Sequence, residues 1–200
     1  MSYWFLVSYV LLWVLVGICF LGVFALYHHF GQMYVSTPEA RATQGPAEGA
    51  LIKATETVSL SGKPLILPKT TPTLVIFAST TCSACTSLRG ATGQLAAAEP
   101  GLSVVVICEG KRHMVQEWAT GMSDLVQVVA DPQNKIGDRY DVDLVPFCVA
   151  VDAEGHVRAK GLVNDYSDLS ALAAKAVLPA DDTTLVPVIA PTISTRNLED

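Results

Sequence analysis

The chain has 200 residues, of which half are hydrophobic and 16% are charged, and its formal net charge is −6. It is therefore more apolar than an average soluble domain. No basic block follows the apolar N-terminus, which argues against a nucleic-acid partner, and the acidic balance argues against tight docking of the domain on anionic lipid.

The excess of apolar residues lies at the N-terminus. Residues 1–38 contain no Asp, Glu, Lys or Arg, and the core of this run, residues 4–27, is long enough as a helix to cross the hydrocarbon layer of a bilayer. A cleaved signal peptide would have a shorter apolar region and a basic start. We therefore predict a transmembrane anchor over residues 1–35, with a buried core helix as the alternative. The nearest basic residue is Arg41, so charge does not orient the anchor.

Composition divides the rest of the chain into three parts. Residues 36–55 are small and polar with Pro and Gly, which indicates a linker. Residues 56–178 have the size of one domain. Residues 179–200 contain three prolines and no helical period, which predicts a flexible tail.

Within the domain, short apolar runs alternate with helical patterns. We predict strands over 73–79, 102–108, 125–130, 147–152 and 156–163, and helices over 83–99, 111–121, 132–140 and 165–177. Pro132 suits the first position of the third helix. The order βαβαβαββα predicts an α/β fold whose mainly parallel sheet is covered by helices on both faces.

The sequence Cys82-Ser83-Ala84-Cys85 opens the first of these helices, directly after a buried strand. Thr80 or Thr81 is a candidate cap for that helix. Cys82 would then lie beside unpaired N–H groups and the positive end of the helix dipole, where a thiolate is stabilised and its pKa falls. Cys85, one turn later, is close enough to form a disulfide with Cys82. We predict an exposed nucleophile at Cys82 and a buried resolving thiol at Cys85.

Two other uses of the pair stay open. A zinc site would need four ligands, and the chain has a single CxxC pair with isolated His113, His156, Cys108 and Cys148. A structural disulfide across one helical turn would close a very small loop and constrain the unfolded chain little. Redox cycling is the use that the strand–CxxC–helix context favours. Cys108 and Cys148 are expected on the strands that flank residues 73–79, as small buried apolar residues. A secondary redox role is the alternative for Cys148, which stands two residues after Pro146.

A proline stands directly before the strand that begins at Phe147, a position that is unusual inside a sheet. Together with the strand TLVIFAS, the CxxC motif and the stretch ADPQNKIGDRYDVDLVPFCVAVDAEGHV, it makes residues 58–177 resemble the thioredoxin-like, membrane-tethered redoxins of the TlpA and ResA type, nearest to the MauD type of methylamine-utilisation proteins. The resemblance implies a mixed sheet and a cis peptide at Pro146. It also implies that the Val145 backbone pairs with an extended substrate.

The chain departs from that family pattern in several places. The family often has an aromatic before the motif and a proline within it, where this chain has Thr81 and Ser83-Ala84. Ile76 stands where thioredoxins carry a buried acid, and Leu88 stands where related redoxins place a Glu. Glu109, at the end of the neighbouring strand, is a candidate substitute for these acids or a solvated loop residue.

The resemblance implies a thiol–disulfide oxidoreductase on the outer face of a membrane, with Cys82 and Cys85 as catalytic residues and Val145 and Pro146 as substrate-binding residues. No bound cofactor or metal is expected beyond the cysteine pair. The expected partners are the bilayer, exported client proteins and a membrane or soluble redox protein that recycles the pair. A disulfide-rich subunit of an amine dehydrogenase is an implied client.

Two rival functions remain. One is a non-catalytic binding or assembly module with a structural Cys82–Cys85 disulfide. The other is a thiol peroxidase, which is disfavoured because Val75 and Ser79 occupy the positions of the Pro and Thr that polarise peroxide in peroxiredoxins.

Overall fold

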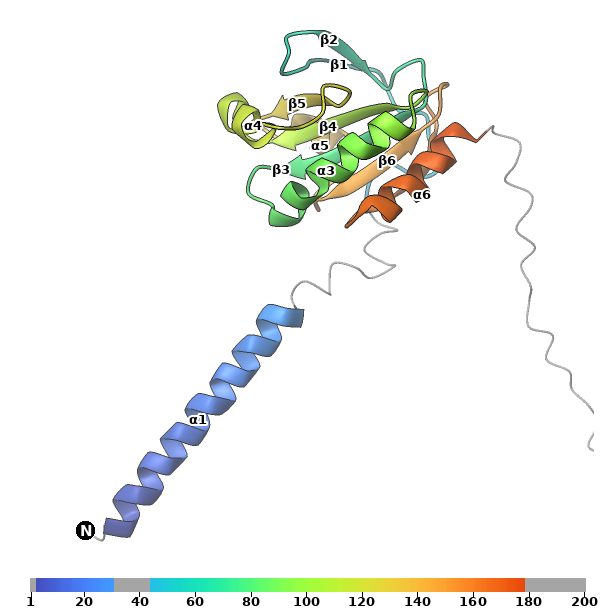
Figure 1. The fold of residues 1–200 in the computed structure, drawn as a ribbon. Coiled ribbons are helices and arrows are strands. Elements are labelled where there is room, and N and C mark those ends of the chain that lie inside the picture. The colour runs from blue at the N-terminus through green and yellow to red at the C-terminus, as the bar shows by residue number, and fades with distance from the viewer. Residues whose placement is uncertain (1–2, 31–43, 179–200) are drawn as a thin grey trace, which may run out of the picture.

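The computed structural model describes residues 3–30 and 44–178 (Figure 1). Helix α1 (Tyr3–Phe30) contains a 19-residue stretch, Leu6–Phe24, that is long and apolar enough to cross a membrane. None of that stretch is buried against other parts of the protein. Within the described residues, α1 is the single helix of this kind. The predicted tail, residues 179–200, lies outside the described residues, as does the first part of the predicted linker.

Five strands form the central sheet, in the spatial order β5-β4-β3-β6-β7. Their bounds are β3 (Thr73–Ser79), β4 (Ser103–Glu109), β5 (Gln127–Asp131), β6 (Phe147–Val151) and β7 (Val157–Leu162). The pairs β3–β4 and β4–β5 are parallel, whereas β3–β6 and β6–β7 are antiparallel. The sheet is therefore mixed. The mixed sheet that the resemblance implies is confirmed: β6 and β7, joined by a short turn, form an antiparallel hairpin beside the parallel strands β3, β4 and β5.

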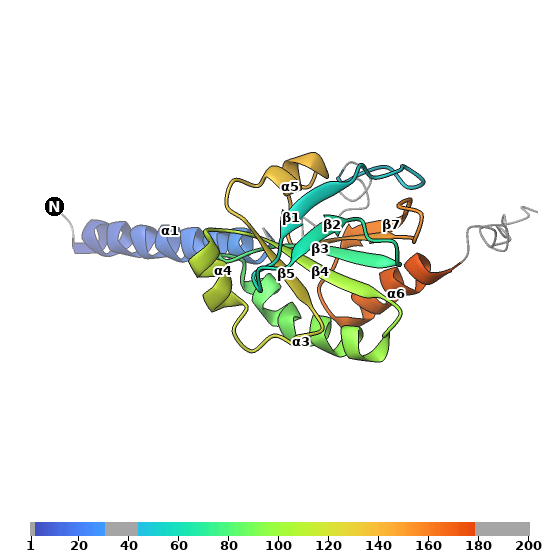
Figure 2. The same ribbon diagram turned by 90° about the horizontal axis from the view of Figure 1, so that it is seen from above.

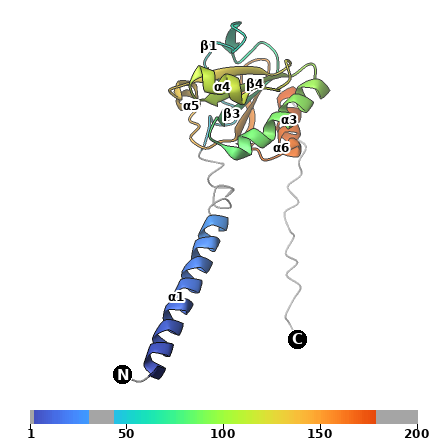
Figure 3. The ribbon, with the colours of Figure 1, turned by 60° about the vertical axis from the view of Figure 1, so that its left-hand side comes forward.

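Helices cover both faces of this sheet, as the alternation of strands and helices predicted (Figure 2). On one face lie α3 (Ser83–Ala98) and α6 (Tyr166–Val177), which run side by side (Figure 3). Val115 of α4 (Arg112–Trp118) packs into the same apolar core. The short α5 (Lys135–Arg139) lies on the opposite face. The predicted order βαβαβαββα is confirmed from β3 to α6.

The sheet separates two apolar cores. One core gathers Cys85, Leu88, Leu95 and Leu169 from the helices with alternate residues of β3, β4 and β6. The other core lies on the opposite face of the sheet. It contains the residues of β3, β4 and β6 that alternate with those in the first core, together with Tyr140 and two leucines that precede β3 in the chain. β3 is buried at every position because both of its faces are covered. This burial explains why its sequence is a continuous apolar run.

A second, two-stranded antiparallel sheet was missed by the sequence analysis. It consists of β1 (Thr55–Val58) and β2 (Pro64–Leu67). Leu65 and Leu67 are buried against the second core, whereas Ile66 between them is exposed. This is a strand alternation, but four residues are too few to distinguish it from a loop by sequence.

Part of the predicted linker is packed on the domain. The Gly45 N–H donates to the Asp141 carbonyl over 2.7 Å, and the Gly49 N–H donates to the Val157 carbonyl over 2.7 Å. Leu51 forms an isolated bridge with His156. The packed unit in the described structure therefore begins at residue 44 and includes the second half of the segment predicted as a linker.

The start of α5 corrects the role predicted for Pro132. The helix begins at Lys135, after Asn134 in the left-handed region (φ 51°). The carboxylate of buried Asp131 accepts hydrogen bonds from the N–H groups of Lys135, Ile136 and Gly137. An aspartate thus satisfies the free donors of the first turn, and Pro132 precedes the helix instead of opening it.

Candidate active site

The cysteine pair lies where β3 ends and α3 begins. Cys82 and Cys85 form a disulfide, with their Cα atoms 5.3 Å apart. Cys82 is itself the residue that caps α3, and its Sγ accepts a hydrogen bond from the Cys85 N–H at 3.1 Å. The predicted cap at Thr80 or Thr81 was therefore wrong. The sulfur occupies the position that a Ser or Asp oxygen takes in other helices, so the helix N-terminus acts directly on the Cys82 Sγ.

Hydrogen bonds hold the turn that presents Cys82. The Cys82 N–H donates to the Ser79 carbonyl at 3.2 Å, and the hydroxyls of Ser79 and Thr81 lie 3.1 Å apart. The Thr80 N–H donates to the carbonyl of Glu109 at 3.2 Å, which ties the turn to the end of β4. The turn is thus fixed on the buried strand, and Cys82 remains only partly buried.

Cys85 lies below Cys82 in an apolar environment. Its side chain is 2% exposed and belongs to the core that also contains Ile76 and Leu88. A small cavity borders Cys85, and its lining residues include Ile76, Thr92, Trp118 and Pro146. Arg89 alone among the lining residues is ionisable besides Cys85. No carboxylate therefore adjoins the buried sulfur in this cavity, as the apolar residues at positions 76 and 88 imply.

Arg89 takes part in a network that the sequence analysis did not find. Its guanidinium donates to the carbonyls of Trp118 and Thr120 and lies 5.9 Å from the centre of the Trp118 ring. The Trp118 indole N–H donates to the Thr86 hydroxyl at 3.2 Å. These contacts join α3 to the end of α4. They place a positive charge one helical turn after Cys85, and the spacing of Cys85 and Arg89 by four residues was the signal available in the sequence.

The loop before β6 faces the cysteine pair across the end of the sheet. The Val145–Pro146 peptide bond is cis, as the resemblance implied. The Val145 carbonyl oxygen lies 4.0 Å from the Cys82 Sγ, and Pro146 is buried beside the cavity at Cys85. The structure therefore brings all four predicted site residues, from segments 60 positions apart, to one place. Their predicted roles remain expectations.

Cys108 and Cys148 have a different environment. They lie on β4 and β6, the two neighbours of β3, as predicted, and neither side chain is exposed. Burial raises the pKa of the Cys108 thiol to about 12, and the adjacent Glu109 charge adds to this. Burial alone raises the pKa of Cys148 further above its usual range. Both thiols are therefore protonated and unreactive in the folded protein near neutral pH.

Other candidate residues lie apart from the reactive sulfurs. The Glu109 side chain is exposed, consistent with a solvated acid. Val75 is buried in the centre of β3, where it pairs with Val105 and Val149. In residues 3–30 and 44–178, no three His, Cys, Asp or Glu side chains gather in a group that could hold a metal ion. That the protein needs no cofactor stays a prediction.

The mixed sheet, its helices and the cysteine pair at the start of α3 define a thioredoxin-like fold. Solved structures agree with this assignment. A secreted Mycobacterium tuberculosis disulfide oxidoreductase homologous to E. coli DsbE superposes with a TM-score of 0.53 at 23% identity, over 60% of this chain and 94% of that one. StoA from Bacillus subtilis superposes with a TM-score of 0.53 at 15% identity, over 64% of this chain and 98% of that one. At these identities the likeness shows the fold.

Curated sequences give a more specific likeness. The chain is 34% identical over 103 residues to the methylamine utilization protein MauD of Methylorubrum extorquens, which covers 50% of this chain and 48% of that protein. It is 34% identical over 101 residues to MauD of Paracoccus versutus, covering half of each chain. The match thus spans about half the length of these relatives. No protein-family model matches the chain. The resemblance predicted from the motifs is confirmed.

Proposed function

We propose that this protein is a thiol–disulfide oxidoreductase, anchored in a membrane by α1, whose redox domain acts outside the cytoplasm on exported proteins. The observation that carries the proposal is the geometry of the cysteine pair. Cys82 is partly exposed at the helix N-terminus with an N–H donor aimed at its sulfur, and Cys85 is buried within bonding distance. This arrangement suits the Cys82 sulfur to attack a disulfide and the Cys85 sulfur to resolve the mixed disulfide that forms.

The proposed reaction is an exchange of sulfur–sulfur bonds. In the reducing direction, the Cys82 thiolate attacks one sulfur of a client disulfide, and the other client sulfur leaves as a thiolate. Cys85 then attacks Cys82, which re-forms the Cys82–Cys85 disulfide and releases the second client thiol. Two electrons and two protons pass from the protein to the client. The oxidising direction is the same sequence in reverse.

The environment of Cys85 shapes the second step. This thiol must lose its proton to attack, and no carboxylate lines the cavity beside it. The Arg89 charge, one turn away and held by the Trp118 and Thr120 carbonyls, favours the thiolate over the thiol at Cys85. Solvent that reaches Cys82 is the proton acceptor in this proposal. Val145 supplies the backbone edge along which an extended client segment aligns.

The relatives indicate a client. They carry the name methylamine utilization protein, and each match spans about half of this chain and half of the relative. We therefore include in the proposal that the client is a disulfide-rich exported subunit of a methylamine dehydrogenase-like enzyme. A membrane or soluble redox protein would recycle the cysteine pair.

The midpoint potential of the Cys82–Cys85 pair tests the proposed activity. It is measured on the full chain in detergent by alkylation of free thiols after equilibration in dithiothreitol or glutathione buffers. A potential near the thioredoxin value of about −270 mV would identify a reductant, and one near about −120 mV would identify an oxidant. A pair that does not titrate reversibly would overturn the proposal and favour the binding module with a structural disulfide. Thioredoxin-dependent turnover of peroxide would instead favour the peroxidase.

A further inference from the structure

The described part of the chain that follows the membrane helix first meets the domain beside the active site. The Gln44 side-chain oxygen accepts a hydrogen bond from the Leu144 N–H at 3.1 Å. Leu144 immediately precedes Val145, whose carbonyl oxygen lies 4.0 Å from the Cys82 sulfur. One residue of the segment therefore binds the loop that borders the cysteine pair, across a sequence separation of 100.

Gly45 adds two hydrogen bonds to the same attachment. Its N–H donates to the Asp141 carbonyl at 2.7 Å, and its own carbonyl accepts from the Lys160 ammonium at 3.0 Å. Lys160 also binds the Gln44 carbonyl. Gly45 has φ +71°, and a Cβ at this position would lie 2.7 Å from the Phe147 ring. Position 45 therefore requires glycine on two grounds, and we call residues 44–45 with these contacts the latch.

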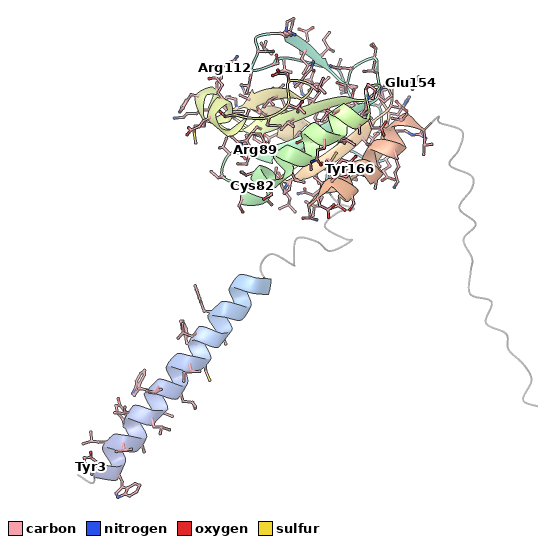
Figure 4. All side chains as sticks on the ribbon, viewed as in Figure 1. Tyr3, Cys82, Arg89, Arg112, Glu154 and Tyr166 are labelled. Carbon is pink, nitrogen blue, oxygen red and sulfur yellow. A yellow bond between two sulfur atoms is a disulfide. The ribbon has the colours of Figure 1, made fainter. Side chains whose placement is uncertain are left out.

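Beyond the latch, the chain runs away from the active site. Gly49 binds Val157 near the start of β7, and Leu51 bridges to His156 in the turn between β6 and β7. That turn lies at the opposite end of the sheet from Pro146, because β6 begins beside Phe77 and ends beside Thr73. Figure 4 shows Cys82 and Glu154, which marks this turn, at opposite ends of the domain. The latch is thus at the Cys82 end.

We propose that the latch makes the Cys82 end of the domain the end that faces the bilayer. The last residue of α1 is Phe30, and 14 peptide steps separate it from Gln44, at most about 50 Å of chain. Every path from the membrane helix into the domain passes through the latch. In the proposed orientation the far end, at Glu154, lies farther from the membrane than the latch does.

The orientation selects the kind of partner, an inference that rests on the proposed function. The reacting sulfurs of the partner would lie at the bilayer surface, on a membrane protein or on a client held there, because a partner in bulk solution would meet the Glu154 end of the domain first. The latch also couples the tether to the loop that carries Val145. Gln44 is a positioning residue in this proposal and does not touch the sulfurs.

Depth-dependent fluorescence quenching in lipid nanodiscs tests the orientation. The full chain carries Cys19→Ala, Cys82→Ala and Cys85→Ala, and the remaining Cys108 and Cys148 are fully buried. A fluorophore is attached through Ser83→Cys in one sample and through Glu154→Cys in the other; both positions are exposed. With a spin label on the lipid headgroups, we expect several-fold stronger quenching at position 83 than at position 154. Equal quenching, or stronger quenching at 154, would overturn the proposal.

Latch variants in the same two labelled proteins test the cause. Gln44→Ala and Gly45→Ala are expected to bring the ratio of the two quenching values close to one. Glu48→Ala, an exposed change in the same segment, is the control and should leave the ratio unchanged. A quenching ratio that stays high in Gln44→Ala would show that the latch does not orient the domain. The Gln44→Ala result decides this point even if Gly45→Ala fails to fold. Because these proteins lack the cysteine pair, their result is independent of the redox titration that tests the proposed function.

Discussion

The domain contains two kinds of cysteine, and their surroundings differ more than their positions. Cys82 and Cys85 lie at the start of α3, and Cys108 and Cys148 lie on the strands either side of β3. Cys85, Cys108 and Cys148 belong to the same apolar core. Only the first pair has a helix N-terminus at one sulfur and a bonded partner at the other. The comparison teaches that membership of the apolar core does not distinguish the two kinds of cysteine, whereas position at a helix N-terminus and access to solvent do.

The largest effect is expected from removal of the partly exposed sulfur. Cys82→Ser should abolish the reduction of insulin disulfides in the presence of dithiothreitol, because the remaining Cys85 is buried. Cys85→Ala should instead accumulate a mixed disulfide between Cys82 and the substrate, detected by non-reducing electrophoresis. Cys108→Ala is the matched control, with activity close to the unchanged protein. Full activity in Cys82→Ser would remove the distinction between the two pairs.

We expect the free energy of unfolding to fall at high pH because the strand cysteines are buried. The pKa of Cys108 is raised to about 12 from its ordinary 9.0, so the folded state holds the proton that the unfolded state loses first. The contribution of the protonated Cys108 thiol to the free energy of unfolding is complete below pH 9 and declines as the pH rises to about 12. Tyr140, with a pKa raised to about 12 by burial, adds to the decline above pH 10. Urea unfolding across this range should show a steep loss of stability.

A matched variant isolates the contribution of the thiol. In Cys108→Ala the loss of stability above pH 9 should be shallower than in the unchanged protein, with the contributions of Cys148 and Tyr140 remaining. Identical slopes in the two proteins would contradict the burial argument for Cys108.

A smaller effect is expected at Arg89, which lies between the cysteine pair and α4. Arg89→Gln removes a charged donor to the Trp118 and Thr120 carbonyls and should lower the free energy of unfolding by about 1–3 kcal/mol. Loss of the charge should also make the Cys85 thiolate less favourable, so the rate of release of the Cys82 mixed disulfide should fall. Arg89→Lys, which keeps the charge, should restore that rate more than it restores stability. Equal rates in the Gln and Lys variants would argue against an electrostatic role.

The smallest effect should come from Trp118. Trp118→Phe keeps the ring over Arg89 and removes the hydrogen bond to the Thr86 hydroxyl, at a cost of about 0.5–1.5 kcal/mol in thermal or urea unfolding. Disulfide exchange should be unchanged within error, because the indole N–H points to α3 and not to a sulfur. A large loss of exchange would extend the reactive region to the end of α4.

Much of this molecule could be predicted from local sequence. The strand at 73–79 is confirmed residue for residue, because a fully buried strand is a continuous apolar run between turn residues. The cysteine spacing predicted that Cys82 and Cys85 could form a disulfide at a helix start, and the structure contains this disulfide. The four-residue strands β1 and β2 were not found, since their alternation is too short to stand out from a loop. The cap of α3 was assigned to threonine because a sulfur rarely takes that position.

The sequence by itself determined the features that depend on residues close together in the chain. A buried strand, a CxxC pair at the next helix and an apolar N-terminal helix all follow from spacing and composition. Tertiary structure alone decided which distant residues meet. Gln44 binds Leu144, Arg89 binds the end of α4, and Val145 lies beside Cys82. Such contacts depend on the order of the strands in the sheet and on where the loops pack. Neither can be predicted from local sequence periodicity.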